Sequence, residues 1–503
     1  MLQNVLASWG GQLVFVIAGF IMPRMIDRHV GQTALGVWDF AWSLVAYFSL
    51  VQGGVVSSVN RFVARFRAAN DMQGLNRAVS SVTVILLAMG LTVVVLSIAA
   101  SLAVPQLLGE QLKDHVADAK WVVVLLGLGV SIQIALSGYG GVLTGCHRWD
   151  LHHAINGGGY ALTVVAMVVV LQLGCGLPGL ALVYLCGDAC GRFARLVVAY
   201  RVCPGLSVRL SSARWKNACE MLTFGGKSFV TRVAELLMNP AISILIVSFM
   251  GPASLALYTR PRSLIRHART FVTRFALVLT PTASSYQAMH RKRELGDLLV
   301  KATMFGAFIS FPMMAALAIL GGPLLHLWMG PRYAHGSLIL ALVLGHLGLL
   351  FQLPIACVLA GLNAHGRSGL ANLAASLCSV SLAAVGLAKW KLSLTTVALV
   401  VGTPITVANA CYVPLYACRQ LRVPFSRFIV KGLCKPLLCC LPFCLCLLGV
   451  RALFSTSPAR ALLYGGVVGG PLLALTYWRW ALPHHMRRGI ADALLLRKRS
   501  ALG

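Results

Sequence analysis

Arginine is concentrated in one short segment of a chain that is otherwise largely apolar. The stretch TRPRSLIRHARTFVTR, residues 259–274, contains five arginines and one histidine, whereas 58% of all residues are hydrophobic. A guanidinium group can bind a carboxylate or a phosphate through two parallel hydrogen bonds. The segment therefore indicates a binding site for an anion, provided that the fold brings several of these side chains to one face.

Membrane-spanning helices are the elements that must position these arginines. Of the 503 residues, 11% are charged and the mean hydropathy is +0.80, whereas about a quarter of the residues of a soluble domain are charged. Runs of about 20 apolar residues cross a hydrocarbon core. Fourteen such runs lie near residues 4–26, 35–59, 78–104, 121–145, 154–174, 177–200, 222–248, 256–282, 302–328, 336–361, 367–388, 393–418, 428–450 and 459–482. The sequence predicts an all-α polytopic membrane protein with 14 transmembrane helices.

The loops between these runs are short and differ in charge. None is long enough for a separate soluble catalytic domain, and the first run lacks the basic start and the cleavage pattern of a signal peptide. The loops on one side, together with the C-terminal tail, hold 23 lysines and arginines, and the opposite loops hold 9. Positive loops remain in the cytoplasm, so we expect both termini to be cytoplasmic.

Most of the net charge of +30 is explained by this orientation and by attraction to anionic lipid headgroups, so nucleic-acid binding is not needed to explain it. Eleven basic side chains remain within or at the edges of the runs, and five of them belong to residues 259–274. The fifteen cysteines lie mostly inside apolar runs without paired CxxC spacing, which predicts neither disulfides nor a metal site. No cofactor is expected.

An internal repeat fixes the expected architecture. Residues 30–40, VGQTALGVWDF, align with residues 250–261, MGPASLALYTRP, which places Gly31 over Gly251. Residues 141–156 align with 357–372, and residues 57–78 align more weakly with 284–302. The offset of about 220 residues covers six runs, an even number, so both copies run in the same direction.

Two parallel six-helix lobes follow from this repeat, with two additional C-terminal helices. We expect an N-lobe at residues 1–210, a C-lobe at 211–420, and helices 13 and 14 with a basic cytoplasmic tail at 421–503. In such designs the substrate binds between the lobes near the middle of the membrane, and the lobes expose it alternately to either side.

Three segments carry a resemblance to a known family. GQTALGVWDFAWSLVAYFSLVQGG at 31–54, NRFVAR at 60–65 and VLTGCHRWDLHHAI at 142–155 resemble the polysaccharide-transport branch of the MATE-like MOP (multidrug/oligosaccharidyl-lipid/polysaccharide) flippase superfamily. The resemblance covers most of the first twelve runs and rests on diffuse patterns. It implies a flippase for undecaprenyl-pyrophosphate-linked oligosaccharides such as O-antigen repeat units.

The repeat alignment places residues 259–274 in the eighth span. At about 100° per residue, Arg262, Arg266 and Arg269 form a stripe roughly 60° wide. Arg260 and Arg274 lie off the stripe and are expected to extend toward opposite membrane surfaces. An arginine facing lipid costs about 2.5–3.5 kcal/mol on insertion scales, so we expect the stripe to face a hydrated cavity.

The seventh span supplies a second polar face to this predicted cavity, formed by Lys227, Arg232, Glu235 and Asn239. Glu235 is expected at the depth of the arginine stripe, where one carboxylate could brace an arginine but could not neutralise all these cations. The surplus charge predicts an anionic ligand, for which a pyrophosphate between lipid and sugar is a match. A purely structural ion-pair network between the two spans is the alternative. The first lobe has Ala46, Ser49 and Phe15 where Arg266, Arg269 and Glu235 stand in the second.

Other polar residues in the spans are more ambiguous. Asn4, Ser8 and Gln12 form a stripe on the first span that could line the cavity. Asp39 is interpreted as an acidic residue near a helix N-terminus, with a protonatable coupling residue as the alternative. Asp188 and Arg192 are interpreted as a structural i, i+4 pair, and His346 as a packed core side chain.

Alternating access for a lipid-linked oligosaccharide, without covalent chemistry, is therefore the leading functional hypothesis. The alternatives are a lipid II flippase, a drug or cation antiporter of the same fold, and a membrane-embedded polysaccharide polymerase, ligase or glycosyltransferase. The expected partners are the lipid-linked oligosaccharide, membrane lipids and a polysaccharide polymerase machinery, but not nucleic acid. The sequence leaves open whether H+, Na+, the membrane potential or polymerisation drives the cycle.

Overall fold

The chain folds into long helices, as the apolar runs predict. The computed structural model describes residues 2–52, 55–214, 219 and 238–481, and within these ranges every regular element is a helix. The chain divides into two compact units, one of Met1–Leu257 with Leu387–Lys391 and one of Tyr258–Gly386 with Leu392–Gly503. This confirms the all-α class.

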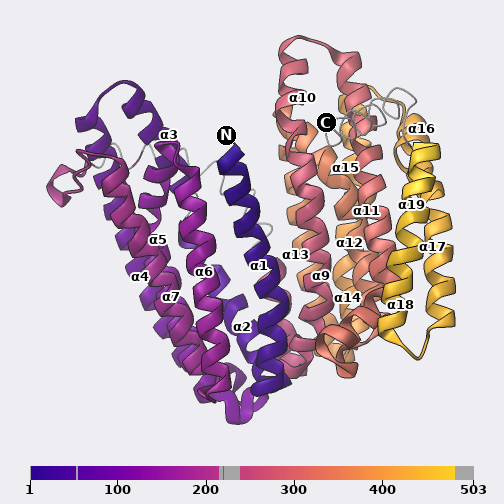
Figure 1. The fold of residues 1–503 in the computed structure, drawn as a ribbon, viewed down its shortest axis with the longest axis horizontal. Helices are drawn as coiled ribbons and strands as arrows, with labels where there is room; N and C mark the ends of the chain where they lie inside the picture. The colour runs from indigo at the N-terminus through magenta and orange to yellow at the C-terminus, as the bar shows by residue number, and fades with distance from the viewer. Residues whose placement is uncertain (1, 53–54, 215–218, 220–237, 482–503) are drawn as a thin grey trace, which may run out of the picture. The chain divides into compact units, whose positions relative to one another are not determined.

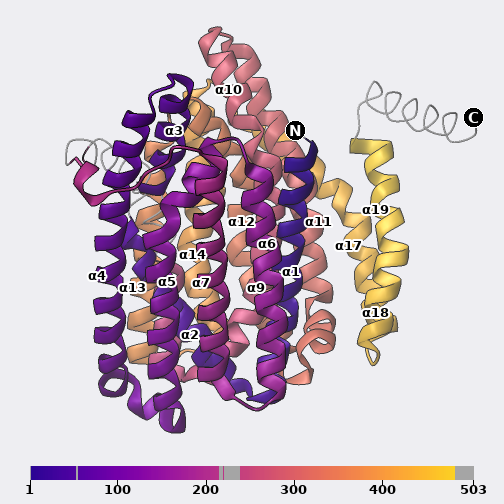
Figure 2. The same cartoon turned by 60° about the vertical axis from the view of Figure 1, so that its left-hand side comes forward.

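The first unit is built around a layer of neighbouring long helices (Figures 1 and 2). Helix α5 packs against α4 and α7, while α6 packs against α1 and α7. Gly157 of α6 lies so close to α1 that an added Cβ would be 2.8 Å from the Cα of Gly11. The helices of this unit are α1 (Leu2–His29), α2 (Gln32–Phe48), η1 (Ser49–Gln52), α3 (Val55–Ala68), α4 (Met72–Leu112), η2 (Lys113–His115), α5 (Val116–Gly145), α6 (Trp149–Gln172), α7 (Gly176–Val202) and η3 (Leu210–Ser212).

The second unit begins within α9 and is centred on α11 and α12. Helix α11 packs against α12 and α17, and α12 also packs against α14. Residues 238–250 form a helix that precedes α9. The remaining helices are α9 (Pro252–Leu277), α10 (Leu279–Ala288), α11 (Lys292–Met329), η4 (Pro331–Tyr333), α12 (Gly336–Gly361), α13 (Gly366–Trp390), α14 (Leu394–Val407), α15 (Val413–Gln420), α16 (Phe425–Phe428), α17 (Lys435–Leu453), α18 (Pro458–Tyr464) and α19 (Gly470–Thr476). Four π-helical turns continue several of these, at Ala408–Tyr412, Ile429–Cys434, Gly465–Gly469 and Tyr477–Ala481.

Helix length and composition agree with a multi-pass membrane protein. Nine helical segments in the described ranges are both long and apolar enough to cross a membrane. Helices α1, α7 and α9, with 28, 27 and 26 residues, also exceed the roughly 20 residues that a hydrocarbon core requires. The predicted span 222–248 lies largely outside the described residues, so the number fourteen stays a prediction.

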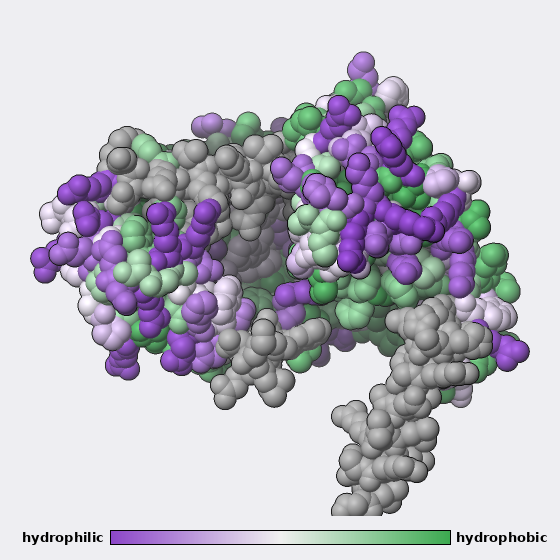
Figure 3. All heavy atoms as spheres, turned by 90° about the horizontal axis from the view of Figure 1, so that it is seen from above, coloured by the Kyte–Doolittle hydropathy of each residue, from purple (hydrophilic) through white to green (hydrophobic). Residues whose placement is uncertain are grey.

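Apolar side chains cover the outside of several helices. Leu91 and Leu102 of α4 are 67% and 61% exposed, and Leu162 of α6 is 74% exposed. Contiguous apolar exposure is expected where a surface meets lipid rather than water. Hydrophilic side chains instead gather at helix ends, and in each unit they cover the end that carries the α3–α4 or α10–α11 turn (Figure 3).

The turns support the internal repeat in atomic detail. The turn after α3 has Asn70 at φ 54 and the turn after α10 has His290 at φ 54. In each turn the left-handed residue donates its N–H to the carbonyl three residues back, and the next residue donates five residues back, as in a Schellman motif. The same bonds occur after α5, where His147 has φ 59, and after α12, where Asn363 has φ 53.

A repeated glycine contact also links the two copies. A Cβ added to Gly145 of α5 would lie 2.7 Å from Val63 and 3.0 Å from the carbonyl oxygen of Asn60. A Cβ added to Gly361 of α12 would lie 2.7 Å from Ala283 and 2.5 Å from the carbonyl oxygen of Thr280. The two glycines are 216 residues apart and their partners 220, close to the offset of about 220 in the sequence alignment, so the same close helix packing occurs in both copies. The division into three parts at residues 210 and 420 stays a prediction.

Candidate functional site

The arginine-rich segment forms a single helix. Helix α9 runs from Pro252 to Leu277 and includes Pro261 in its interior. A proline removes one helical hydrogen bond, a loss that helices of membrane proteins tolerate when neighbouring groups satisfy the backbone. Because the helix is continuous, Arg262, Arg266 and Arg269 lie along one stripe, as the sequence predicts.

Burial differs among the five arginines of this helix. Arg262 and Arg269 are half-buried, whereas Arg266 and Arg274 are exposed. Arg260 is only 5% exposed, and its Nε and Nη2 lie 3.3 and 3.0 Å from the hydroxyl oxygen of Thr259. The expectation that Arg260 extends to the membrane surface is wrong. Its neighbours one turn away on the same face, Ala256 and Leu264, are both buried, so this face packs against protein.

Arg262 and Arg269 lie near groups that can position their charges. The guanidinium carbon of Arg262 is 5.9 Å from the ring centre of Tyr258, which is 1% exposed. A cation over a desolvated aromatic ring is stabilised by about 2 kcal/mol. Both arginines also act electrostatically on His346 of α12. An aromatic ring and an imidazole group therefore lie near the stripe.

The sequence predicts His346 to be a packed core side chain, and the structure places it on α12 near the stripe. The side chain is half-buried, and its Nδ1 donates a hydrogen bond of 2.8 Å to the carbonyl oxygen of Leu342. That bond orients the imidazole ring through Nδ1, so Nε2 is the ring nitrogen that could contact a ligand. The available signal was a single ionisable residue within an apolar span, which by default indicates function.

The predicted acidic partner of the stripe is Glu235. Lys227, Arg232 and Glu235 lie outside the residues that the structure describes. Asn239 is described, is half-buried, and accepts a hydrogen bond of 3.2 Å from Ser243 through its backbone carbonyl. The bracing role of Glu235 stays a prediction.

The candidate polar residues of the first unit fall on α1 and α2. Asn4, Ser8 and Gln12 all lie within α1, and Gln12 is half-buried. Asp39 does not open its helix as expected, because α2 already begins at Gln32. The field of the helix dipole fades beyond the first turn, so the interpretation of Asp39 as a favourable N-terminal charge is wrong. Its side chain is half-buried, and the alternative role as a protonatable coupling residue stays a prediction.

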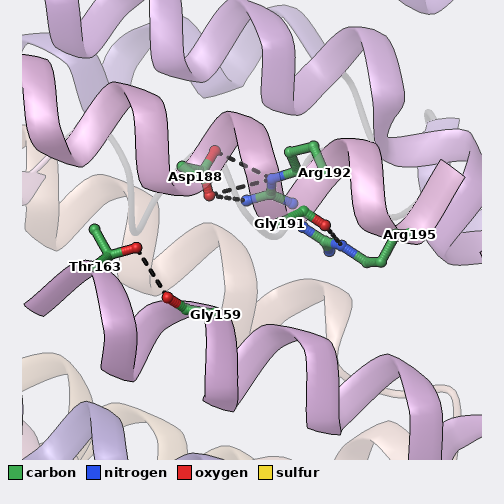
Figure 4. A network of polar contacts seen from close by, with 6 residues as sticks. All are labelled: Gly159, Thr163, Asp188, Gly191, Arg192 and Arg195. Atoms are coloured by element: carbon green, nitrogen blue, oxygen red, sulfur yellow. Dashed lines mark hydrogen bonds and ion pairs between the residues drawn. The ribbon is translucent and has the colours of Figure 1, made fainter. Parts of the chain in front are cut away.

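Helix α7 holds a charged cluster that the sequence only partly revealed. Nε of Arg192 lies 3.2 and 3.1 Å from the two carboxylate oxygens of Asp188, and Nη2 lies 3.0 Å from one of them. The expected i, i+4 pair is therefore present. Arg195, one turn further, is 6% exposed and donates from Nε to the carbonyl oxygen of Gly191 at 3.3 Å (Figure 4). Asp188, Arg192 and Arg195 are spaced by four and three residues, and this helical spacing is the sequence signal for a charged stripe.

This cluster borders a cavity of about 140 Å³ among α1, α6 and α7. The walls combine charged, amide and aromatic groups on three helices. The lining residues are Phe15, Ile155, Asn156, Gly159, Tyr160, Thr163, Tyr184, Gly187, Asp188, Gly191, Arg192 and Arg195.

A pair of thiols lies near the helix ends of the first unit. Cys146 follows α5 and Cys203 follows α7, and they are 6% and 3% exposed. A hydrogen bond from Cys203 lowers the pKa of the Cys146 thiol to about 6, with a further contribution from the charge of Arg67. The same interaction raises the pKa of Cys203. All fifteen cysteines are free thiols.

Part of the chain matches a known protein family, and most of it is similar to one curated protein. A family described as "Polysaccharide biosynthesis protein" matches residues 150–337. The uncharacterized membrane protein EpsK of Bacillus subtilis (strain 168) is 23% identical over 449 residues, which are 86% of each chain. These findings agree with the resemblance inferred from the sequence.

Solved structures share the fold. The lipid II flippase MurJ in an inward closed conformation aligns with a TM-score of 0.69 at 14% identity, covering 95% of this chain and 99% of that chain. An inward-facing multidrug resistance MATE transporter of the MOP superfamily aligns with a TM-score of 0.68 at 15% identity, covering 84% and 96%. The chain therefore has a MATE-like fold, and its long apolar helices are those of a multi-pass membrane protein.

Proposed function

We propose that this protein is a flippase that moves undecaprenyl-pyrophosphate-linked oligosaccharide, an O-antigen or similar repeat unit, across the bacterial inner membrane by alternating access. The observation that carries the proposal is the cationic stripe of α9 in a MATE-like fold. Three arginines on one long helix, two of them half-buried, are costly in a membrane unless they bind an anion or face water.

Pyrophosphate matches the chemistry of this stripe. Arg262 and Arg269 lie on one face of α9 near His346. A guanidinium group can bind phosphate oxygens through two hydrogen bonds. The other predicted contacts remain predictions, with Lys227, Arg232, Glu235 and Asn239 for the anion and Gln12 and Asp39 for sugar hydroxyls. Translocation makes and breaks no covalent bond, so no catalytic residue is assigned.

A lipid II flippase is the second candidate, and the likeness to MurJ over 95% of the chain supports it. Both candidates carry a polyprenyl pyrophosphate, so the cationic stripe suits either one. A cation antiporter fits less well because cationic drugs need acidic groups, whereas α9 contains no acidic residue. A polymerase or ligase would need larger loops than the sequence provides.

Gene deletion in the native bacterium tests the proposal. We expect lipid-linked repeat units to accumulate with their glycan on the cytoplasmic face, where a membrane-impermeant glycosidase reaches it only after spheroplasts are lysed. Normal surface polysaccharide without this accumulation would overturn the proposal. Rescue of a strain that lacks its peptidoglycan flippase would instead favour the lipid II candidate.

The coupling ion and the partners are part of the proposal. Transport driven by H+ or Na+ predicts that a collapse of one ion gradient, with the other intact, stops the appearance of labelled glycan on the outer face. We also propose that polysaccharide polymerase machinery receives the translocated unit, and that both chain termini are cytoplasmic. Labelling by an impermeant maleimide of a cysteine added at either terminus tests that orientation.

A further inference from the structure

The cluster on α7 places more positive than negative charge inside the first unit. Asp188 lies near the middle of the helix, about 18 Å from its first residue at 1.5 Å per residue, and so at a depth where ionisable groups are rare and functional. Asp188 and Arg192 neutralise one another through three hydrogen bonds. Arg195 then contributes one further positive charge.

Arg195 is buried and borders the cavity. It is 6% exposed, and among the residues that the structure describes its guanidinium has one recorded hydrogen bond, from Nε to the Gly191 carbonyl. A guanidinium has five N–H groups that donate hydrogen bonds. Arg195 is one of the residues that line the cavity, so its remaining N–H groups suit a ligand that supplies acceptors and a negative charge.

The other walls are suited to a sugar ring. Phe15 and Tyr160 stack with ring centres 4.4 Å apart, which gives the cavity a flat aromatic wall. Tyr184 is held edge-on by Trp42 at 5.0 Å. The amide of Asn156 and the carboxylate of Asp188 supply polar groups for hydroxyls, and ligand sites typically combine apolar walls with a few such groups.

Two glycines create the space. Gly159 of α6 faces Gly191 of α7, since a Cβ added to Gly159 would lie 4.0 Å from the Gly191 Cα (Figure 4). A Cβ added to Gly191 would meet nothing within 4 Å. The volume of about 140 Å³ is below the roughly 300–1,000 Å³ of sites for drug-sized ligands, so the cavity suits one sugar residue rather than a whole oligosaccharide.

We propose that this cavity binds a carboxylate-bearing sugar of the translocated glycan, with Arg195 binding the carboxylate and Tyr160 lying against the ring. This inference rests on the proposed function and names the kind of glycan. A phosphate monoester carries about −1.5 to −2 charges at neutral pH, more than the single surplus charge here can balance. A sugar carboxylate carries one charge and brings hydroxyls for Asn156 and Asp188.

Purified full-length protein provides the test, with free monosaccharides as probes. We expect glucuronate to raise Tm in a saturable manner, and glucose or inorganic phosphate at the same concentration to leave it unchanged. Arg195→Gln should weaken glucuronate binding about tenfold or more, because a charge-assisted contact contributes about 1.5–3 kcal/mol. Arg195→Lys should keep part of the binding, since it keeps the charge.

Two further variants separate binding from folding. Gly191→Leu should fill the cavity and abolish the glucuronate effect without lowering the Tm of the unliganded protein, because the added side chain points into open space. Arg201→Gln, at an exposed position in the last turn of α7, is the matched control and should bind glucuronate normally. Equal stabilisation by glucose, or unchanged binding in Arg195→Gln, would overturn the proposal.

Failure here and failure of the flippase proposal have different signatures. If deletion causes lipid-linked units to accumulate while glucuronate does not bind, the flippase proposal stands and the acidic-sugar site is wrong. If phosphate stabilises the protein and Arg195→Gln removes that effect, the cavity holds a phosphate and the sugar assignment is overturned. If glucuronate binds but deletion causes no accumulation of lipid-linked units, the binding site stands and the flippase proposal is wrong.

Discussion

Two helices carry arginines through the interior of this protein, and they do so differently. On α7, Arg192 is paired with Asp188 on the same helix, and Arg195 borders a small cavity. On α9 the helix sequence contains no carboxylate. A charge balanced within its own helix suits a neutral or singly charged group, whereas an accumulation of cations suits a multiply charged one.

The comparison shows that the scaffold repeats while the chemistry does not. The turns that contain Asn70 and His290 have the same hydrogen bonds, yet the arginine positions of α9 correspond to Ala46 and Ser49 in the first copy. At the offset of 216 residues, Asp188, Arg192 and Arg195 in turn correspond to Pro404, Ala408 and Cys411. Each copy has therefore acquired its charges on a different helix.

The largest expected effect concerns α9. Replacing both Arg262 and Arg269 with glutamine should lower the rate at which labelled glycan appears on the outer face by about 100-fold or more. Two charge-assisted contacts of about 1.5–3 kcal/mol each would be lost. Arg274→Gln, at an exposed position off the stripe, is the control and should transport normally. Equal transport by the double variant and the control, at equal protein levels, would sink the assignment of the stripe.

A second prediction concerns the paired charges of α7. Asp188→Asn should destabilise the purified protein by about 2–4 kcal/mol, because it leaves Arg192 charged and without its carboxylate. The double variant Asp188→Asn with Arg192→Gln should recover much of that loss. Thermal unfolding in detergent measures both, and a double variant less stable than the single one would show that the pair is not coupled in this way.

The repeated glycine contact gives a third and smaller effect. Gly145→Ala and Gly361→Ala should each lower stability by about 1–3 kcal/mol, since the added methyl group overpacks a helix contact. Gly449→Ala, where an added Cβ meets nothing within 4 Å, should leave stability unchanged. Unequal losses at Gly145 and Gly361, measured by denaturant or heat, would break the equivalence of the two copies.

The smallest expected effect is a pH dependence confined to the first copy. Because the pKa of Cys146 is lowered to about 6, its thiolate fraction should rise through pH 6 and be nearly complete at pH 7.5. Cys203→Ala removes the hydrogen bond that is the main cause, so the rise should move to higher pH. The rate at which Cys146 is alkylated reports its thiolate fraction, and mass spectrometry of the alkylated peptides measures that rate. An unchanged dependence of the rate on pH in Cys203→Ala would contradict the prediction. The second copy has Leu362 at the equivalent position.

Hydropathy and repetition predicted the fold well because they depend on local sequence. Apolar runs have the length of the membrane, and turns such as that at Asn363 need only a short motif. The stripe of α9 followed from helical periodicity alone. These are properties that a single helix determines by itself.

Packing between helices was the part that sequence could not supply. Periodicity gave the angle of Arg260 on its helix but not the neighbour that buries it. It also gave the Asp188–Arg192 pair but not the cavity beside Arg195, which depends on how closely α6 approaches at Gly159. Asp39 lies further inside its helix than the sequence predicts, because α2 begins at Gln32 rather than near residue 35.

The close contact of α1 with α6 has a consequence for the wall of the cavity. Gly11 meets Gly157 without interlocking side chains, and one turn further Phe15 stacks on Tyr160 at the cavity wall. A Cβ at Gly157 would lie 2.8 Å from the Cα of Gly11, so any side chain there would push α1 away from α6 and carry Phe15 away from Tyr160. The absence of a side chain at Gly157 therefore keeps the aromatic wall of the cavity in place.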